Sequence, residues 1–194
     1  MRIVGGRFRG RRLVAPLGAA TRPTSDRVRQ ALFDMLLHAP WAVGVVEGAA
    51  VLDAFAGTGA LGLEALSRGA AAATFLERDR AALAALRANV AACGAAKDSR
   101  VIEADALRPP RGSPATLPRG SPATLIFLDP PYGQGAIPRA VAALDAAGWL
   151  ALGALLIAEI GRDEPSPFAA PLVARTLVTR THGAARIEAA RLGS

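Results

Sequence analysis

The sequence is poor in the residues that form disulfides and bind metals. Its 194 residues include one cysteine, Cys93, and two histidines, His38 and His182. One cysteine excludes an internal disulfide and suits a reducing cytoplasm, and no histidine, cysteine or acidic cluster has metal-ligand spacing. The longest apolar run, Trp149 to Ala158, is too short to cross a bilayer. We therefore expect a cytoplasmic protein with no metal and no membrane attachment.

Arginine is the residue that the sequence concentrates, and it gathers near the N-terminus. The formal net charge is +7, and residues 1–30 carry eight arginines against one acidic residue, Asp26. The remaining 15 basic and 15 acidic residues balance. The length suits one domain with a complete core. A neutral domain with a basic N-terminal segment indicates a polyanionic partner.

The stretch from Val51 to Gly62 predicts a buried strand, a tight turn and the start of a helix. Gly57 and Gly59 allow the backbone to turn sharply and to approach a ligand without an intervening side chain. A strand, a glycine turn and a helix in this order form the nucleotide-binding corner of a doubly wound α/β sheet.

Two ligands compete for this corner, a dinucleotide and S-adenosylmethionine (AdoMet). Gly57-x-Gly59-x-x-Gly62, followed by Glu77, fits the dinucleotide pattern. Asp53 lies at the end of the strand, where a carboxylate would repel a pyrophosphate. AdoMet has no phosphate, and its ammonium and sulfonium groups favour a nearby carboxylate. We therefore expect AdoMet as the cofactor.

Strand and helix patterns alternate from residue 51 onward. We expect strands at 51–55, 73–77, 100–103, 124–128 and 154–160, and helices at about 60–67, 80–92 and 137–147. Residues 172–179 and 184–190 are expected to form a terminal antiparallel pair around Gly183. The alternation predicts an α/β fold with a mostly parallel sheet and helices on both faces.

The basic N-terminal segment predicts two short strands joined by a turn over residues 2–14. In an extended segment Arg7, Arg9 and Arg11 share one face at intervals of about 6.6 Å, so that they can follow successive phosphates. Arginine also binds phosphate in bidentate fashion and stacks on bases, and Phe8 can stack or pack inward. The alternative is a solvated basic arm without a specific partner.

A helix follows the linker at residues 16–23. Thr24 or Ser25 is expected to cap it. An apolar stripe indicates that the helix docks on the main domain; it comprises Val28, Ala31, Leu32, Met35 and Leu36. Arg27 and Arg29 fall off that stripe, and Arg22 and Arg27 extend the basic surface or are simply exposed to solvent.

Acidic residues stand at the ends of four predicted strands, where ligands bind in such sheets. Asp53 follows the first strand. Glu77 ends the second, in a position to accept hydrogen bonds from ribose hydroxyls, and Asp105 follows the third, in a position to accept one from the adenine amine. Asp129 ends the fourth strand. Four acids in such positions indicate a ligand site.

Asp129-Pro130-Pro131-Tyr132 is the most specific motif in the sequence. The two prolines fix φ and stiffen the turn. The Asp129 carboxylate and the Pro130 carbonyl are both acceptors, so together they can hold the two hydrogens of an exocyclic amine for in-line methyl transfer. Tyr132 can stack on the base, which must be unstacked or lie in a loop.

The chain resembles the bacterial 16S ribosomal RNA (guanine(966)-N2)-methyltransferase family, which is RsmD-like and belongs to the class I AdoMet-dependent methyltransferases. The likeness rests on residues 2–13, 22–29, 53–66, 75–79 and 148–150 and on the Asp-Pro-Pro-Tyr turn. It implies a Rossmann-like, seven-stranded sheet with an antiparallel C-terminal strand. It also implies AdoMet-dependent methylation of a guanine 2-amino group in small-subunit ribosomal RNA, within a partly assembled subunit.

With this resemblance, residues 1–40 are expected to be an RNA-binding hairpin and docking helix, and residues 41–194 a methyltransferase domain that acts as a monomer. The expected catalytic residues are Asp129, Pro130, Pro131 and Tyr132. The expected cofactor contacts are Asp53, Phe55, Gly57, Thr58, Gly59, Glu77, Arg78, Asp105, Ala106 and Asp129. The expected RNA contacts are Arg2, Arg7, Phe8, Arg9, Arg11, Arg12, Arg22 and Arg27.

The sequence departs from the family pattern in two respects. The octapeptide at 110–117 is repeated without change at 118–125, which indicates a recent duplication in a tolerant, mobile loop. The C-terminal strand lacks the aromatic residues expected in the family.

Two other functions also fit the motifs. The Asp-Pro-Pro-Tyr turn suits DNA adenine-N6 or cytosine-N4 methylation as well, although no target-recognition domain is present. A non-enzymatic RNA-binding assembly factor is the other alternative.

Overall fold

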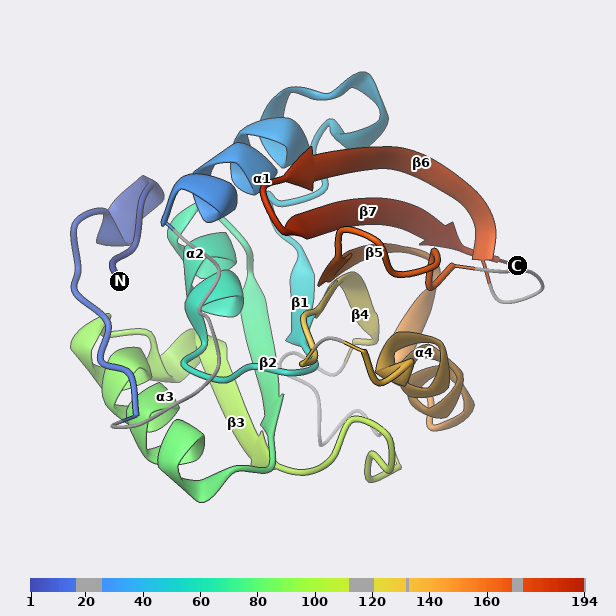
Figure 1. Ribbon diagram of the computed structural model, residues 1–194. Coiled ribbons are helices and arrows are strands. Elements are labelled where there is room, and N and C mark those ends of the chain that lie inside the picture. The colour runs from blue at the N-terminus through green and yellow to red at the C-terminus, as the bar shows by residue number, and fades with distance from the viewer. Residues whose placement is uncertain (17–25, 112–120, 132, 169–172, 194) are drawn as a thin grey trace.

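A seven-stranded sheet forms the centre of the molecule. The computed structural model describes residues 1–16, 26–111, 121–131, 133–168 and 173–193. The strands are β1 (Ala50–Asp53), β2 (Ala72–Glu77), β3 (Ser99–Glu103), β4 (Ala123–Leu128), β5 (Leu150–Gly161), β6 (Val173–His182) and β7 (Ala185–Leu192). Their spatial order is β3-β2-β1-β4-β5-β7-β6 (Figure 1).

The direction of the strands confirms the predicted sheet. β1 to β5 pair in parallel, whereas β7 is antiparallel to both β5 and β6. The β6–β7 turn contains Gly183, whose φ of 63° is in the left-handed region that glycine adopts readily. The C-terminal strand pairs on both sides despite its lack of aromatic residues.

Helices cover both faces of the sheet. They are α1 (Asp26–His38), α2 (Ala60–Ser67), α3 (Arg80–Ala92) and α4 (Ala136–Ala146), with short 3-10 helices η1 (Gly6–Phe8), η2 (Pro40–Ala42) and η3 (Ala96–Asp98). Because successive strand residues point to opposite faces, Phe127 packs in the core with α1, α2 and α3, and Ile126 packs in the core with α4. The sheet therefore has three helices on one side and α4 on the other (Figure 1).

The N-terminal segment forms the predicted hairpin in a shortened form: the Ile3 N–H donates to the Arg11 carbonyl at 2.9 Å, the Gly10 N–H to the Ile3 carbonyl at 2.9 Å and the Leu13 N–H to the Met1 carbonyl at 3.1 Å. It contains one antiparallel bridge, between Arg2 and Arg12, and η1 occupies the position of the expected turn. Glu64 of α2 accepts from the N–H groups of Val4 and Gly5, each at 2.8 Å, and so holds the hairpin against the main domain. Because η1 includes Arg7, the prediction that Arg7, Arg9 and Arg11 form one extended row is wrong.

The position of Arg29 is a second correction. The sequence places it outside the apolar stripe of α1, yet its side chain is 0 % exposed. It forms ion pairs with Asp26 at 2.8 Å and with Glu64 at 3.5 Å, and it donates to the Arg2 carbonyl. Two acidic partners and a carbonyl explain how a charged side chain is accommodated in the interior.

Some predictions fall on residues that the structure does not describe. They concern the helix cap at Thr24 or Ser25, the RNA contact of Arg22, most of the duplicated octapeptide and the role of Tyr132. Within the described ranges, no helix combines the length and apolar character needed to cross a membrane.

Candidate active site

The carboxyl ends of the parallel strands bring the predicted acidic residues to one edge of the sheet. In the β1 register Asp53 is the partner of Phe75 on β2 and of Phe127 on β4. Glu77 ends β2, and Asp129 follows β4 directly. Ligands in open α/β sheets bind beyond this edge, so the acids lie at the edge of the sheet where a ligand is expected.

The glycine turn between β1 and α2 is tied to both neighbouring strands. The Ala54 N–H donates to the Phe127 carbonyl of β4, and the Ala56 N–H donates to the Leu76 carbonyl of β2, both at 3.0 Å. Gly57 has a φ of 52°, and a Cβ at this residue would meet no described atom within 4 Å. The backbone at Gly57 therefore borders open space, as a turn that cradles a ligand does.

Asp53 differs from the other three acids because it is buried. Only 1 % of the residue is exposed, and its Oδ2 accepts a hydrogen bond from the Gly62 N–H at 3.0 Å. Burial raises the pKa of Asp53 to about 7, the Gly62 N–H opposes this rise, and the Glu77 charge adds to it. In the described conformation Asp53 therefore connects β1 to the first turn of α2.

Glu77 is held in a fixed orientation by backbone donors. Its Oε2 accepts from the Gly57 N–H at 2.7 Å. Its Oε1 accepts from Arg78 at 2.7 Å and from Asp79 at 2.8 Å. A carboxylate offers about four acceptor positions, so Glu77 retains capacity for a ligand hydroxyl beside the glycine turn.

Asp105 and Arg78 form a pair at the surface beyond β3. Arg78 Nη1 lies 3.0 Å from Asp105 Oδ2, and Asp105 Oδ1 accepts from the Leu107 N–H at 2.9 Å. The side chain of Asp105 is partly exposed and Ala106 is buried. The pair links the residue that follows β2, Arg78, to the residue that follows β3 by two positions, Asp105.

The turn after β4 is built on one buried proline. Pro130 is buried, Pro131 is exposed and Asp129 is half-buried. After the prolines, the N–H of Gly133 donates to Glu164 Oε1 at 3.0 Å. Phe55 of the glycine turn is half-buried and packs in the same core as Leu128, which precedes Asp129. The glycine turn and the proline turn thus stand on adjacent strands, β1 and β4.

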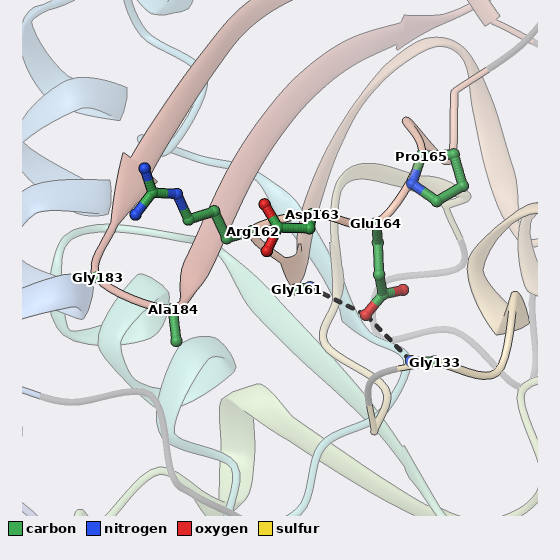
Figure 2. A pocket seen from close by; sticks show the side chains of 8 residues that line it. All are labelled: Gly133, Gly161, Arg162, Asp163, Glu164, Pro165, Gly183 and Ala184. Carbon is green, nitrogen blue, oxygen red and sulfur yellow. Dashed lines mark hydrogen bonds between the residues drawn. The ribbon is translucent and has the colours of Figure 1, made fainter.

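An open depression lies beside the proline turn. Its volume is about 860 Å³ and it is lined by Gly133, residues 161–165 after β5, and the β6–β7 turn at Gly183 and Ala184 (Figure 2). Because β4, β5 and β6 end at the same edge of the sheet, the depression lies at the edge that carries the proline turn.

The basic N-terminal segment lies against the glycine turn. Asn89 of α3 donates to the carbonyls of Thr58 and Val14, at 2.9 and 3.0 Å, and accepts from the Val14 N–H at 2.8 Å. The Met1 sulfur is 4.0 Å from the Thr58 hydroxyl. One buried side chain therefore connects the basic segment, the glycine turn and α3.

Most of the predicted RNA contacts are at the surface. Arg2, Arg9, Arg11, Arg12 and Arg27 are exposed. Arg7 is also exposed, but it forms an ion pair of 3.0 Å with Asp98 and its guanidinium stands 4.6 Å from the Phe8 ring centroid. Phe8 is half-buried and packs against the core, so it anchors the segment.

Sequence reasoning missed four residues that shape this site: Arg29, Glu64, Asn89 and Glu164. Each has a polar side chain that binds the backbone, or a charged side chain, of a residue distant in the sequence. Glu64 and Asn89 stand among the apolar residues of helices, and a lone polar residue in such a setting is the one signal that could have found them. In the part of the chain that the structure describes, no group of three or more His, Cys, Asp and Glu residues could hold a metal ion.

The strand order, the antiparallel β7 and the glycine turn after β1 define a class I methyltransferase fold. Residues 1–189 match the family model described as Conserved hypothetical protein 95. The chain belongs to this family, together with the proteins named ribosomal RNA small subunit methyltransferase D.

Three relatives show the extent of the likeness. The Escherichia coli (strain K12) ribosomal RNA small subunit methyltransferase D is 42 % identical over 161 residues, 82 % of this chain and 74 % of the relative. The Haemophilus influenzae protein of the same name is 32 % identical, covering 85 % of this chain and 81 % of the relative. The solved structure of yhhF from Escherichia coli has a TM-score of 0.80 at 35 % identity, covering 100 % of this chain and 98 % of that one.

Proposed function

We propose that this protein uses AdoMet to methylate the exocyclic 2-amino group of a guanine in small-subunit ribosomal RNA. The names of the relatives support the coarser part of the proposal, methylation of small-subunit ribosomal RNA. In the finer part, an exocyclic amine as acceptor rests on the Asp129-Pro130-Pro131 turn beside the glycine turn, and the choice of guanine rests on the resemblance to the guanine-N2 methyltransferase family. The position of this turn at the end of β4 is the observation that carries the proposal.

The proline turn presents two acceptors of fixed direction. The Asp129 carboxylate and the Pro130 carbonyl accept the two hydrogens of the amine and thereby orient its nitrogen. Accepting these hydrogens also reduces the delocalisation of the nitrogen lone pair into the ring. Catalysis comes mainly from positioning, since the acceptors are held before the substrate arrives.

The residues around the glycine turn fit AdoMet. Bound AdoMet would supply the electrophilic methyl group. Glu77 is oriented by three N–H groups and would hold the ribose hydroxyls, and Asp105 would accept from the adenine amine. The buried Asp53 keeps the turn closed on α2 and provides a carboxyl at the end of β1. Phe55, Thr58, Gly59, Arg78 and Ala106 complete the proposed contacts.

The RNA would approach from the side of the N-terminal segment. A base presented to the proline turn must leave its stack or lie in a loop. The exposed arginines of residues 1–40 provide sequence-independent phosphate contacts near the glycine turn. We propose this segment as the RNA-binding part and residues 41–194 as the methyltransferase part of a monomer that acts in the cytoplasm on a partly assembled small subunit.

Methyl-transfer assays with Asp129→Ala test the proposed role of the turn. We expect transfer to fall by at least about 100-fold, while the dissociation constant for AdoMet changes by less than about threefold. Asp145→Ala, an exposed acid on α4, is the matched control and should keep wild-type activity. Retained transfer in Asp129→Ala would remove the turn from the reaction.

The substrate is tested separately by comparing ribosomal RNA, small subunits and duplex DNA in the same assay. Mapping the modified nucleotide in ribosomal RNA from a deletion strain should show one guanine that has lost its 2-amino methylation. Transfer to duplex DNA alone would support a DNA amino-methyltransferase. Full complementation of the deletion by Asp129→Ala would support a non-enzymatic assembly factor.

A further inference from the structure

The loop after β5, residues 161–166, lies beside the proline turn that follows β4. β4 and β5 are parallel neighbours, with Leu128 opposite Ala158, so both loops leave the sheet at the same edge. Figure 2 shows Glu164 of the β5 loop pointing across the depression toward Gly133, the first described residue after the turn.

The Glu164 carboxylate connects the two loops. Its Oε1 accepts from the Gly133 N–H at 3.0 Å and from the Gly161 N–H at 3.1 Å. A Cβ at Gly161 would stand 2.7 Å from the same oxygen, so the carboxylate packs tightly over the end of β5. One acceptor oxygen therefore fixes the exit of the proline turn relative to a sheet strand.

The backbone that carries Glu164 is itself anchored from β7. Arg186 donates to the carbonyls of Arg162 and Glu164, at 2.7 and 2.5 Å. Arg186 also forms an ion pair of 2.9 Å with Glu188, a buried residue that accepts from the Ser166 hydroxyl at 2.6 Å. Because both ends of the 162–166 segment are held, Glu164 cannot follow the proline turn if the turn moves.

The two prolines fix φ within the turn, but they supply no donors that could hold the turn against the rest of the molecule. Pro130 and Pro131 have no backbone N–H, so the turn cannot fix itself through donors at those two residues. Gly133, which follows the turn, has a left-handed φ of 78°. In a free chain a glycine can adopt many other backbone conformations. A hydrogen bond from Gly133 to a charged acceptor on a fixed loop restricts that freedom.

We propose that Glu164 is a positioning residue for methyl transfer: through Gly133 it holds the chain that follows the Asp129-Pro130-Pro131 turn, and so sets the direction of the acceptors that orient the amine. This inference rests on the proposed function of the turn. Glu164 acts through Gly133 and needs no contact with either substrate. A purely local role, in which Glu164 only closes its own loop through Gly161, makes different predictions.

Three variants test the inference. Glu164→Ala removes the acceptor, Glu164→Gln keeps an oxygen acceptor at the same distance from the backbone, and Asp163→Ala removes an adjacent exposed carboxylate as the matched control. We expect Glu164→Ala to lower kcat by about 10- to 100-fold, the loss typical of a misplaced reacting group. The KM for AdoMet should change by less than about twofold, because the glycine turn is separate. Glu164→Gln should restore most of kcat, and Asp163→Ala should match the wild type.

Amide hydrogen exchange provides a readout that does not depend on activity. In Glu164→Ala the Gly133 amide should exchange about tenfold faster than in the wild type, while Glu164→Gln stays close to the wild type. Gly161→Ala, which displaces the carboxylate without removing it, should have the same effect as Glu164→Ala.

The outcomes separate this inference from the proposed function. Wild-type kcat or unchanged Gly133 exchange in Glu164→Ala overturns the inference, even if Asp129→Ala is inactive. A fall in kcat that Gln does not restore, with unchanged Gly133 exchange, shows the local role. If Asp129→Ala retains methyl transfer, the proposed function fails, and Gly133 exchange still decides whether Glu164 anchors the loop.

Discussion

The carboxyl groups at the edge of the sheet are chemically similar but lie in different environments. Glu77 accepts hydrogen bonds from three backbone N–H groups, which fix the orientation of its carboxylate. Asp53 accepts one and is buried, so its neutral form is favoured and its pKa is about 7. A carboxyl group can therefore serve as an oriented acceptor beside the glycine turn in one position, and in another as a buried connector that exchanges its proton near pH 7.

The raised pKa of Asp53 predicts a pH-dependent stability. The native group binds its proton up to about pH 7, whereas the unfolded group has the ordinary pKa of 3.8. Between these values the native state holds more protons, so the contribution is fully present at low pH and is lost as the pH rises toward 7. The slope from one group is at most about 1.4 kcal/mol per pH unit.

Asp53→Asn tests this expectation because asparagine can still accept from the Gly62 N–H without titrating. Urea unfolding at pH 5, 6, 7 and 8 should show the wild type losing stability with rising pH relative to Asp53→Asn. Asp145→Asn on the exposed face of α4 should leave the wild-type slope unchanged. Parallel pH profiles for wild type and Asp53→Asn would contradict the assignment.

At the scale of elements, α2 joins the cofactor corner to the basic N-terminal segment. Gly62 in its first turn binds Asp53, and Glu64 and Ser67 hold the backbone of residues 4–8. The Glu64 side chain is 0 % exposed and also pairs with Arg68 at 2.8 Å. A helix of eight residues thus carries contacts to both proposed binding surfaces.

Removing Glu64 should be among the most destabilising single changes in the chain. Glu64→Ala leaves the buried Arg29 with one acidic partner and leaves the Val4 and Gly5 amides without theirs. Breaking a buried pair from one side costs about 3–5 kcal/mol. Urea unfolding should show this loss, together with faster exchange of the Val4 and Gly5 amides.

Asp34→Ala is the control for the Glu64 prediction. Asp34 also faces Arg68, at 3.9 Å, but its side chain is half-exposed. Surface pairs of this kind contribute about 0–1 kcal/mol. Equal losses for the two variants would show that burial of Glu64 does not set its energetic role.

At the scale of the whole molecule, the sequence predicted the sheet more reliably than the N-terminal segment. Strands and helices from residue 51 onward follow hydrophobic periodicity, so their existence and order were predictable, and the helices at 60–67 and 80–92 have the predicted bounds. Residues 2–14 have few apolar residues and take their shape from Glu64 and Ser67, more than fifty residues away. Local patterns contain no information about such partners.

The candidate site shows the same division. Asp53, Glu77 and Asp129 were predictable because they end strands, and strand ends meet at one edge. Glu164 follows β5 in a loop whose conformation depends on Arg186 and on the distant Gly133. No periodicity or motif marks it, so only the folded arrangement reveals its contacts.

The concentration of arginine at the N-terminus of an otherwise neutral chain predicts salt-dependent RNA binding. Arg9, Arg11 and Arg12 are exposed on the segment beside α2 and α3, whereas Arg139 is exposed on α4, across the sheet (Figure 1). If the N-terminal arginines neutralise phosphates, each one replaced should flatten the plot of log K against log salt by about 0.7–0.9.

The test compares Arg9→Gln, the triple change of Arg9, Arg11 and Arg12 to glutamine, and Arg139→Gln. Binding to a ribosomal RNA fragment is measured between about 50 and 300 mM salt, because counterion release makes phosphate contacts salt-dependent over this range. The triple variant should bind more weakly and lose about 2–3 in slope, Arg9→Gln about 0.7–0.9, and Arg139→Gln nothing. If the triple variant keeps the wild-type slope, the RNA binds to another surface. Removing arginines that contact phosphates lowers the number of counterions released on binding, and this must reduce the slope.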